Sequence, residues 1–230
     1  QGFIPYRKAD LAKIYGQKRA DQIIKNKEWH SNKKLNEDYK QILYGESISK
    51  YSYIKSDNFI WYGRHLAGYV DLKFFNQKRL LIREITNPTI IASIVEEELV
   101  NDPQIISVIK KNKSHSIELL WAIMNSKLAT FYHFNSSPKA TKGAFPKILV
   151  KDIQNFPFPS NISEKTENII IKIVEQILNE KQINPGTDTT ALEREIDVLV
   201  FKLYDLTYEE VLTVEPEFWL SEEEYEKKVL

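Results

Sequence analysis

Cysteine is absent from the 230-residue sequence, and methionine and glycine are scarce, with one and seven residues. Without cysteine the chain can form no disulfide and has no thiolate nucleophile, as is usual for cytoplasmic proteins. It also lacks a run of about 18 apolar residues and a basic N-terminal stretch followed by an apolar one. We therefore expect no membrane span and no signal peptide. Because the chain begins at Gln1 and Gly2 without a methionine, we expect it to be part of a longer protein.

Catalytic motifs are missing as well. The Asn/Asp/Ser-Pro-Pro-Tyr/Phe motif, with which amino-methyltransferases hold a flipped base, does not occur. Its nearest matches, at 87–89 and 184–186, are typical of turns. No glycine-rich turn follows a predicted strand, the four histidines lack zinc-ligand spacing, and no nucleophile elbow is present. The triplets 38–40 and 226–228 have the terminal spacing of a metal nuclease but no partner carboxylate. We expect this chain itself to be non-catalytic.

The formal net charge is zero, but the charges are unevenly distributed. Residues 1–160 contain 25 Lys and Arg against 15 Asp and Glu, whereas residues 161–230 contain 7 against 17. A basic body followed by an acidic tail indicates a polyanionic partner for the body. The alternative is a mixed, solvated surface without such a partner.

The first part of the chain predicts short strands between turns. Residues 1–38 are rich in lysine, and we expect mostly extended chain with a short helix at 20–27. Apolar and β-branched runs bounded by turn residues predict strands at 41–44, 59–62, 79–86, 90–95 and 104–109. The strands at 79–86 and 90–95 flank the turn at Asn87-Pro88 and are expected to form a hairpin.

The stretch 116–159 is the organising element of the sequence. Its apolar residues recur at three- and four-residue steps, which predicts one long helix with a buried face. These residues are Ile117, Leu120, Trp121, Met124, Leu128, Phe131 and Tyr132. We expect His133, near the helix end, to be a packed or hydrogen-bonded imidazole. Residues 135–143 are polar and contain a proline and a glycine, which predicts a loop. Small hydroxyls and flexible cations on such a loop suit phosphates and base edges.

From residue 163 onward the sequence is helical. Ser163 is a predicted N-cap, and three pairs have capping-box spacing: Thr190 with Glu193, Thr207 with Glu210, and Ser221 with Glu224. We expect an α+β fold with a mixed or antiparallel β-sheet body (residues 1–160) that contains the long buried helix. An acidic C-terminal helical subdomain (residues 161–230) is expected to pack on this body.

Four blocks in the sequence carry a family resemblance. They are 43–51 (LYGESISKY), 78–86 (KRLLIREIT), 119–128 (LLWAIMNSKL) with 145–148 (FPKI) and 156–159 (FPFP), and 195–207 (EIDVLVFKLYDLT). In this order they resemble the TaqI-like C-terminal specificity domain of adenine-N6 DNA methyltransferases, particularly of type IIG restriction-modification enzymes. Asp205 stands where such proteins usually have glycine.

The resemblance implies a DNA target-recognition domain whose partners are double-stranded DNA and an upstream methyltransferase domain of the same polypeptide. It implies no cofactor for this chain. S-adenosylmethionine, and Mg²⁺ if the parent protein also cleaves DNA, are implied for catalytic domains outside the chain.

Four places offer the donors that DNA recognition requires, because Arg, Ser and Thr contact base edges while Lys mostly contacts phosphate. In order of preference they are Ser136, Ser137, Lys139, Thr141 and Lys142; then Ser49, Lys50 and Tyr51; then Arg64 and His65; and finally Arg83. Surface-loop, turn or structural roles are the alternatives, and for Arg83 we favour pairing with Glu84 or Glu96. The main alternative function is a non-enzymatic interaction module with an acidic helical docking surface. A weaker alternative is a metal-dependent nuclease that uses Asp38 and Lys40.

Overall fold

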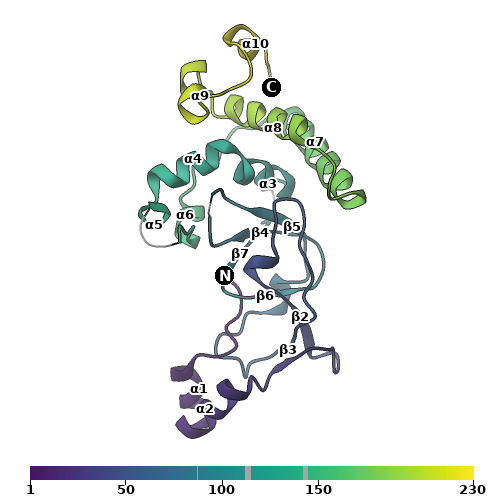
Figure 1. Cartoon of the computed structure of the whole chain (residues 1–230), viewed down its shortest axis with the longest axis vertical. Helices are drawn as coiled ribbons and strands as arrows, with labels where there is room; N and C mark the ends of the chain where they lie inside the picture. Colours follow the sequence, from purple (N-terminus) through teal and green to yellow (C-terminus); the bar gives the residue numbers. More distant parts are fainter. Residues whose placement is uncertain (87, 112–114, 142–144) are drawn as a thin grey trace.

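The computed structural model describes residues 1–230 except 87, 112–114 and 142–144. The fold is α+β, as the sequence predicts. It is elongated, with the N-terminal helices at one end, the C-terminal helices at the other, and two small sheets between them (Figure 1). No helix in the described part of the chain combines the length and apolar character needed to cross a membrane.

The first sheet holds the N-terminal part together. Its strands are β1 (His30–Ser31), β2 (Tyr39–Leu43), β3 (Phe59–Trp61) and β6 (Val100–Asn101), in the order β1-β3-β2-β6. β3 runs antiparallel to β1 and β2, whereas β2 pairs in parallel with β6. The predicted strands at 41–44 and 59–62 therefore form, and β6 adds a partner that is distant in sequence.

Two helices precede this sheet, α1 (Lys8–Tyr15) and α2 (Gln17–Asn26). Gly16 joins them with a φ of 78°, a conformation that costs other residues more than glycine. The sequence predicts only the second helix, over 20–27, so the expectation of extended chain before it was wrong. The reason is that α1 buries a single residue, Leu11, so its sequence has no apolar stripe that would indicate a helix.

The second sheet has the order β5-β4-β7, formed by β4 (Arg79–Arg83), β5 (Ala92–Val95) and β7 (Ile105–Ile109). All pairings are antiparallel, with Leu81 opposite Ser93 and Ser107. The predicted hairpin of 79–86 and 90–95 is confirmed, as is the strand at 104–109. A short 3₁₀ helix, η1 (Gly45–Ser47), follows β2, and a second, η2 (Leu72–Phe74), precedes β4.

Arg79, the first residue of β4, is fully buried. Its guanidinium donates to four backbone carbonyls: Phe75 at 2.5 Å, Leu99 at 2.6 Å, and Gln77 and Glu97 at 3.2 Å. Burial lowers the pKa of Arg79 to about 10. This arginine therefore joins segments 75–77 and 97–99 to the start of β4 and does not face solvent.

The long helix predicted from residue 116 is in fact two helices, α3 (Ile117–Asn125) and α4 (Lys127–Ser136). Ser126 breaks it with an extended ψ of 158°, and its Oγ accepts the N–H of Ala129 at 3.1 Å as the N-cap of α4. The apolar spacing continues through the break, so periodicity alone does not reveal it. Two short helices follow, α5 (Pro138–Thr141) and α6 (Val150–Gln154). Part of the predicted loop is therefore helical.

The C-terminal helices are α7 (Glu164–Ile183), α8 (Thr190–Leu203), α9 (Tyr208–Val214) and α10 (Glu222–Glu226). The predicted cap at Ser163 and the capping boxes at Thr207 and Ser221 are confirmed. At α8 the prediction is one residue off. The N-cap is Thr189, whose Oγ1 donates to Glu193 at 2.8 Å.

The largest core lies around α3, which is almost entirely buried. Trp121 and Ile123 of α3 share this core with Leu80 of β4, Ile173 of α7 and Val200 of α8. α3 is therefore packed between the β5-β4-β7 sheet and the C-terminal helices, and the core continues across residue 160.

Candidate nucleic-acid interface

The segment 136–141, which we call the recognition segment, runs from the end of α4 through α5. Ser136, Lys139 and Thr141 are exposed, whereas Ser137 and Ala140 are buried. The N–H of Ser137 donates to the carbonyl of His133 at 3.0 Å, and no described group bonds its Oγ. Three of the predicted side chains therefore face outward and one faces inward. Lys142 lies outside the described residues.

Backbone hydrogen bonds fix the recognition segment to the end of β4. The N–H of Lys147 donates to the carbonyl of Lys139 at 3.1 Å. On either side of Lys147, the carbonyl of Pro146 accepts the N–H of Thr86 at 3.0 Å, and the N–H of Ile148 donates to the carbonyl of Glu84 at 2.9 Å. Segment and sheet therefore form one unit.

His133 of α4 is hydrogen-bonded to this unit. Its Nε2 is hydrogen-bonded to Thr86 Oγ1 at 3.1 Å in a buried position. Burial lowers the pKa of His133, so the imidazole is neutral near pH 7. The expectation of a hydrogen-bonded imidazole is confirmed.

Arg83 ends β4 beside this unit and is partly exposed. The expected ion pair with Glu84 or Glu96 does not form, because Glu84 pairs with Lys147 at 3.5 Å and Glu96 with Lys78 at 2.9 Å. No carboxylate in the described ranges pairs with Arg83. Its guanidinium is available to an external acceptor.

The turn at Ser49, Lys50 and Tyr51 faces elsewhere. Lys50 Nζ lies 2.8 Å from Glu193 Oε2, and the carbonyl of Lys50 accepts the indole N–H of Trp121 at 2.9 Å. Burial and the nearby Glu193 carboxylate raise the pKa of Tyr51. The turn is thus packed on α3 and α8.

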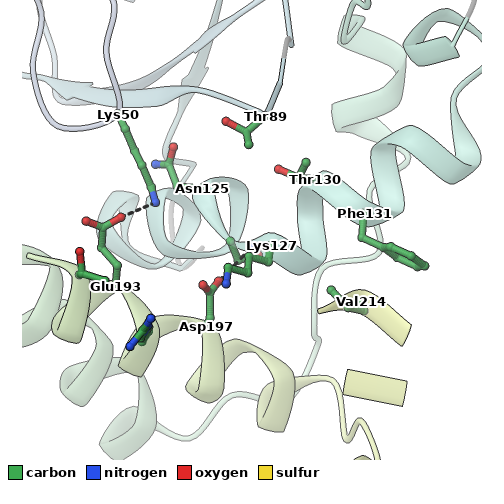
Figure 2. Close-up of a pocket in the computed structure, with 12 residues that line it drawn as sticks. Lys50, Thr89, Asn125, Lys127, Thr130, Phe131, Glu193, Asp197 and Val214 are labelled. Carbon is green, nitrogen blue, oxygen red and sulfur yellow. Dashed lines mark hydrogen bonds and ion pairs between the residues drawn. The ribbon is translucent and has the colours of Figure 1, made fainter. Parts of the chain in front are cut away.

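A cavity of about 490 Å³ lies beside this turn, between the α3–α4 junction and α8. Figure 2 shows Lys50 and Glu193 on one side and Lys127 with Asp197 on the other. The N–H of Lys127 donates to Asp197 at 2.9 Å, and Lys127 Nζ pairs with Glu215. Burial raises the pKa of Asp197 to about 6. The lysines that line the cavity are engaged within the protein.

Arg64 and His65 follow β3 in the first sheet. His65 stacks on Trp61 at 4.1 Å and donates from Nε2 to the Trp61 carbonyl at 2.9 Å. Burial lowers its pKa. Arg64 is exposed over the Tyr69 ring at 5.5 Å. Backbone hydrogen bonds therefore connect the first and fourth of the four predicted places, whereas the second is bonded to α3 and α8 and the third follows β3 in the first sheet.

Sequence reasoning missed two residues at these connected places, Phe145 and Lys147. The Phe145 side chain is 64% exposed. Lys147 is partly exposed beside Glu84. An aromatic residue next to a proline in a basic loop is the signal that would have pointed to this position.

The two candidate nuclease triplets, 38–40 and 226–228, each contain a carboxylate and at least one lysine. Within the described residues, no group of three or more His, Asp or Glu side chains is placed to hold a metal ion. Lys40 pairs with Glu98 at 2.5 Å, Lys227 with Glu223 at 2.6 Å, and Glu226 with Lys202 at 3.6 Å. Three charged side chains of the two triplets are thus paired within the protein.

The chain is similar to known restriction-modification proteins. One relative is "Putative type II restriction enzyme and methyltransferase RM.MjaORFECS2P" of Methanocaldococcus jannaschii, 26% identical over 189 residues, which are 79% of this chain and 16% of that protein. A solved structure of the type IIL restriction-modification enzyme MmeI in complex with DNA has the same fold, with a TM-score of 0.60 and 12% identity over 98% of this chain and 35% of that chain. The chain thus spans well under half the length of either protein.

The family relationship itself rests on residues 40–158, which match the model of the TaqI-like C-terminal specificity domain. These residues run from β2 through α6 and include Arg83 and the recognition segment. They make up more than half of the sequence, so the chain belongs to the family of TaqI-like C-terminal specificity domains.

Proposed function

We propose that this chain is the target-recognition domain of a restriction-modification enzyme and binds double-stranded DNA along the unit formed by β4 and the recognition segment. The observation that carries the proposal is that Arg83, Ser136, Lys139 and Thr141 lie within the family's matched region and on one backbone-bonded unit. Arginine and hydroxyl side chains suit base edges, and lysine suits phosphate. The names of both relatives, a restriction enzyme and methyltransferase and a restriction-modification enzyme in complex with DNA, support it.

The reaction would occur in other domains of the parent protein. In this chain the two glycines that follow strands are covered by side chains, since a Cβ on Gly45 or Gly63 would lie 3.0 Å from Gln104 or His65. These residues do not fit S-adenosylmethionine. We therefore assign methyl transfer to adenine N6, with S-adenosylmethionine, to an upstream domain of the same polypeptide, as in type IIG enzymes, together with Mg²⁺ if the parent cleaves. The enzyme would act in the cytoplasm.

The acidic C-terminal helices support this function as a brace. Glu193 pairs with Lys50, and Asp197 accepts the N–H of Lys127. Glu167 of α7 accepts the N–H of Ser116 at 2.7 Å. Because these carboxylates are directed at the body, the arrangement favours internal bracing over an independent docking surface.

A salt-dependent binding assay tests the proposal. The 230-residue chain would be titrated against labelled duplexes of about 30 base pairs with random sequence, between about 50 mM and about 200 mM salt. We expect Lys139→Ala to weaken binding and to reduce the slope of log affinity against log salt by about one.

The matched control is Lys165→Ala, which removes an exposed lysine from α7 in the acidic region. It should leave both affinity and slope unchanged. The proposal fails if the chain binds no duplex at low salt, or if the two variants behave alike.

A further inference from the structure

Phe145 is the most exposed aromatic side chain in the described part of the protein, at 64%, and no described ring contacts it. Single exposed apolar residues are common on protein surfaces and need no explanation by themselves. What distinguishes Phe145 is its position two residues before the partly exposed Lys147, whose N–H bonds the Lys139 carbonyl of the recognition segment.

The backbone that carries Phe145 is rigidly supported. The next three residues are each bonded to other segments: Pro146 through Thr86, Lys147 through Lys139, and Ile148 through Glu84. Ile148 is also buried in the main core. An apolar side chain that is exposed at the edge of a fixed scaffold can exert force on a bound partner without itself being displaced.

The charges around Phe145 fit the DNA backbone. Lys139 is exposed, and no carboxylate in the described ranges pairs with it. The side chain of Lys147 is 42% exposed, and its Nζ lies 3.5 Å from Glu84 Oε2. Lys139 and Lys147, whose backbones are hydrogen-bonded to each other, can hold phosphates while the ring meets the bases.

We propose that Phe145 is a wedge that inserts between two neighbouring base pairs of the bound duplex, opens that base step and bends the DNA. The proposal rests on the proposed function and adds to it a mode of recognition. Separating stacked bases costs free energy, which the burial of the ring between base faces offsets. Steps that separate easily would then be favoured at one position of the target, independently of direct base contacts.

Fluorescence of 2-aminopurine, which rises when the base loses its stacking, tests the wedge. The probe would be a duplex of about 30 base pairs enriched from a random pool by the wild-type chain, with 2-aminopurine placed at successive positions. We expect a rise at one step with the wild-type chain and with Phe145→Leu, since leucine also serves as a wedge. Phe145→Ala should lose the rise and bind about tenfold more weakly.

Two further measurements separate a wedge from other roles. Phe145→Ala should keep the wild-type salt slope, because no phosphate contact is lost, and a mismatch at the opened step should restore most of its affinity. The control Trp219→Ala, which removes a 46% exposed aromatic ring near the C-terminus, should behave as wild type.

The outcomes are distinct. Wild-type binding without a fluorescence rise at any position, or wild-type affinity of Phe145→Ala, overturns the wedge and leaves the proposed function standing. Absence of any duplex binding by the wild-type chain overturns both.

Discussion

Lys50 Nζ lies 2.8 Å from Glu193 Oε2, and this ion pair joins residues that are 143 positions apart in the sequence. It links the turn after β2 to helix α8, beside the indole N–H of Trp121 that bonds the Lys50 carbonyl. A lysine that looks available for phosphate in the sequence is therefore held by a carboxylate of the acidic helices. The structure thus separates the cations that stabilise the fold from those that face outward.

Replacement of Lys50 tests this separation. We expect Lys50→Ala to lower the free energy of unfolding by about 1 kcal/mol, because both partners of the ion pair are only partly exposed. Glu193→Gln should have a similar effect in urea denaturation. The salt dependence of DNA binding should be unchanged in both variants. Unaltered stability with a smaller salt slope would instead show that Lys50 contacts phosphate, as the sequence suggested.

Arg83 is expected to read a base. Its guanidinium has no ion-pair partner among the described carboxylates, and the arginine fork matches guanine. Arg83→Ala should cost about 1–3 kcal/mol and relax the preference at one position of the target. Selection from a random duplex pool measures this, with Arg83→Lys as the comparison that keeps the charge but not the fork. An unchanged target sequence would contradict the assignment.

Arg79 is expected to be structural. Arg79→Met should lower the free energy of unfolding by more than about 3 kcal/mol, because buried carbonyls of Phe75 and Leu99 lose their donor. Arg7→Met is the control, since Arg7 is 53% exposed in its pair with Asp10. Its cost should stay below about 1 kcal/mol. Equal effects of the two substitutions in urea denaturation would refute the distinction.

Stability should also depend on pH through buried carboxyl groups. Burial raises the pKa of Asp197 and of Asp102 to about 6, above the ordinary value of about 3.9 for an aspartate. Between its ordinary value and about 6, each of these two groups binds more protons in the folded protein than in the unfolded chain, so the pair adds to the free energy of unfolding as pH falls from 7 toward 5. The lowered pKa values of His30, His65 and His133 act in the opposite direction, so the contribution of the aspartates is isolated by substitution.

Asp197→Asn should remove part of this rise, about 1–2 kcal/mol given the partial exposure of the side chain. The amide oxygen can still accept the N–H of Lys127. Urea denaturation at several pH values measures the effect, with the exposed Asp57→Asn as control. Identical pH profiles of wild type and Asp197→Asn would show that Asp197 has an ordinary pKa.

Local signals in the sequence account for much of the fold. Ser163, Thr207 and Ser221 cap helices because each hydroxyl accepts the backbone N–H of the residue three positions later. The hairpin of β4 and β5 was predicted from the turn residues that separate the two strands in the sequence. The break at Ser126 is different, because a serine inside a continuous apolar pattern reads as helix until its dihedral angles are known.

Long-range relationships could not be predicted. The parallel pairing of β2 with β6, the burial of Arg79 and the ion pair of Lys50 all depend on residues far apart in sequence. At the candidate interface, the sequence identified the recognition segment and Arg83 separately. Only the hydrogen bonds around Glu84 and Pro146 show that they are neighbours.

The burial of α3 between a sheet and two later helices has a practical consequence for engineering. A fragment that ends at residue 158, where the family match ends, would lack Ile170 and Val174 of α7, which share a core with Trp121. The apolar side chains of α3 would then be exposed to water. Grafts of specificity domains of this family should therefore extend through α8, so that α3 keeps the helices that cover it.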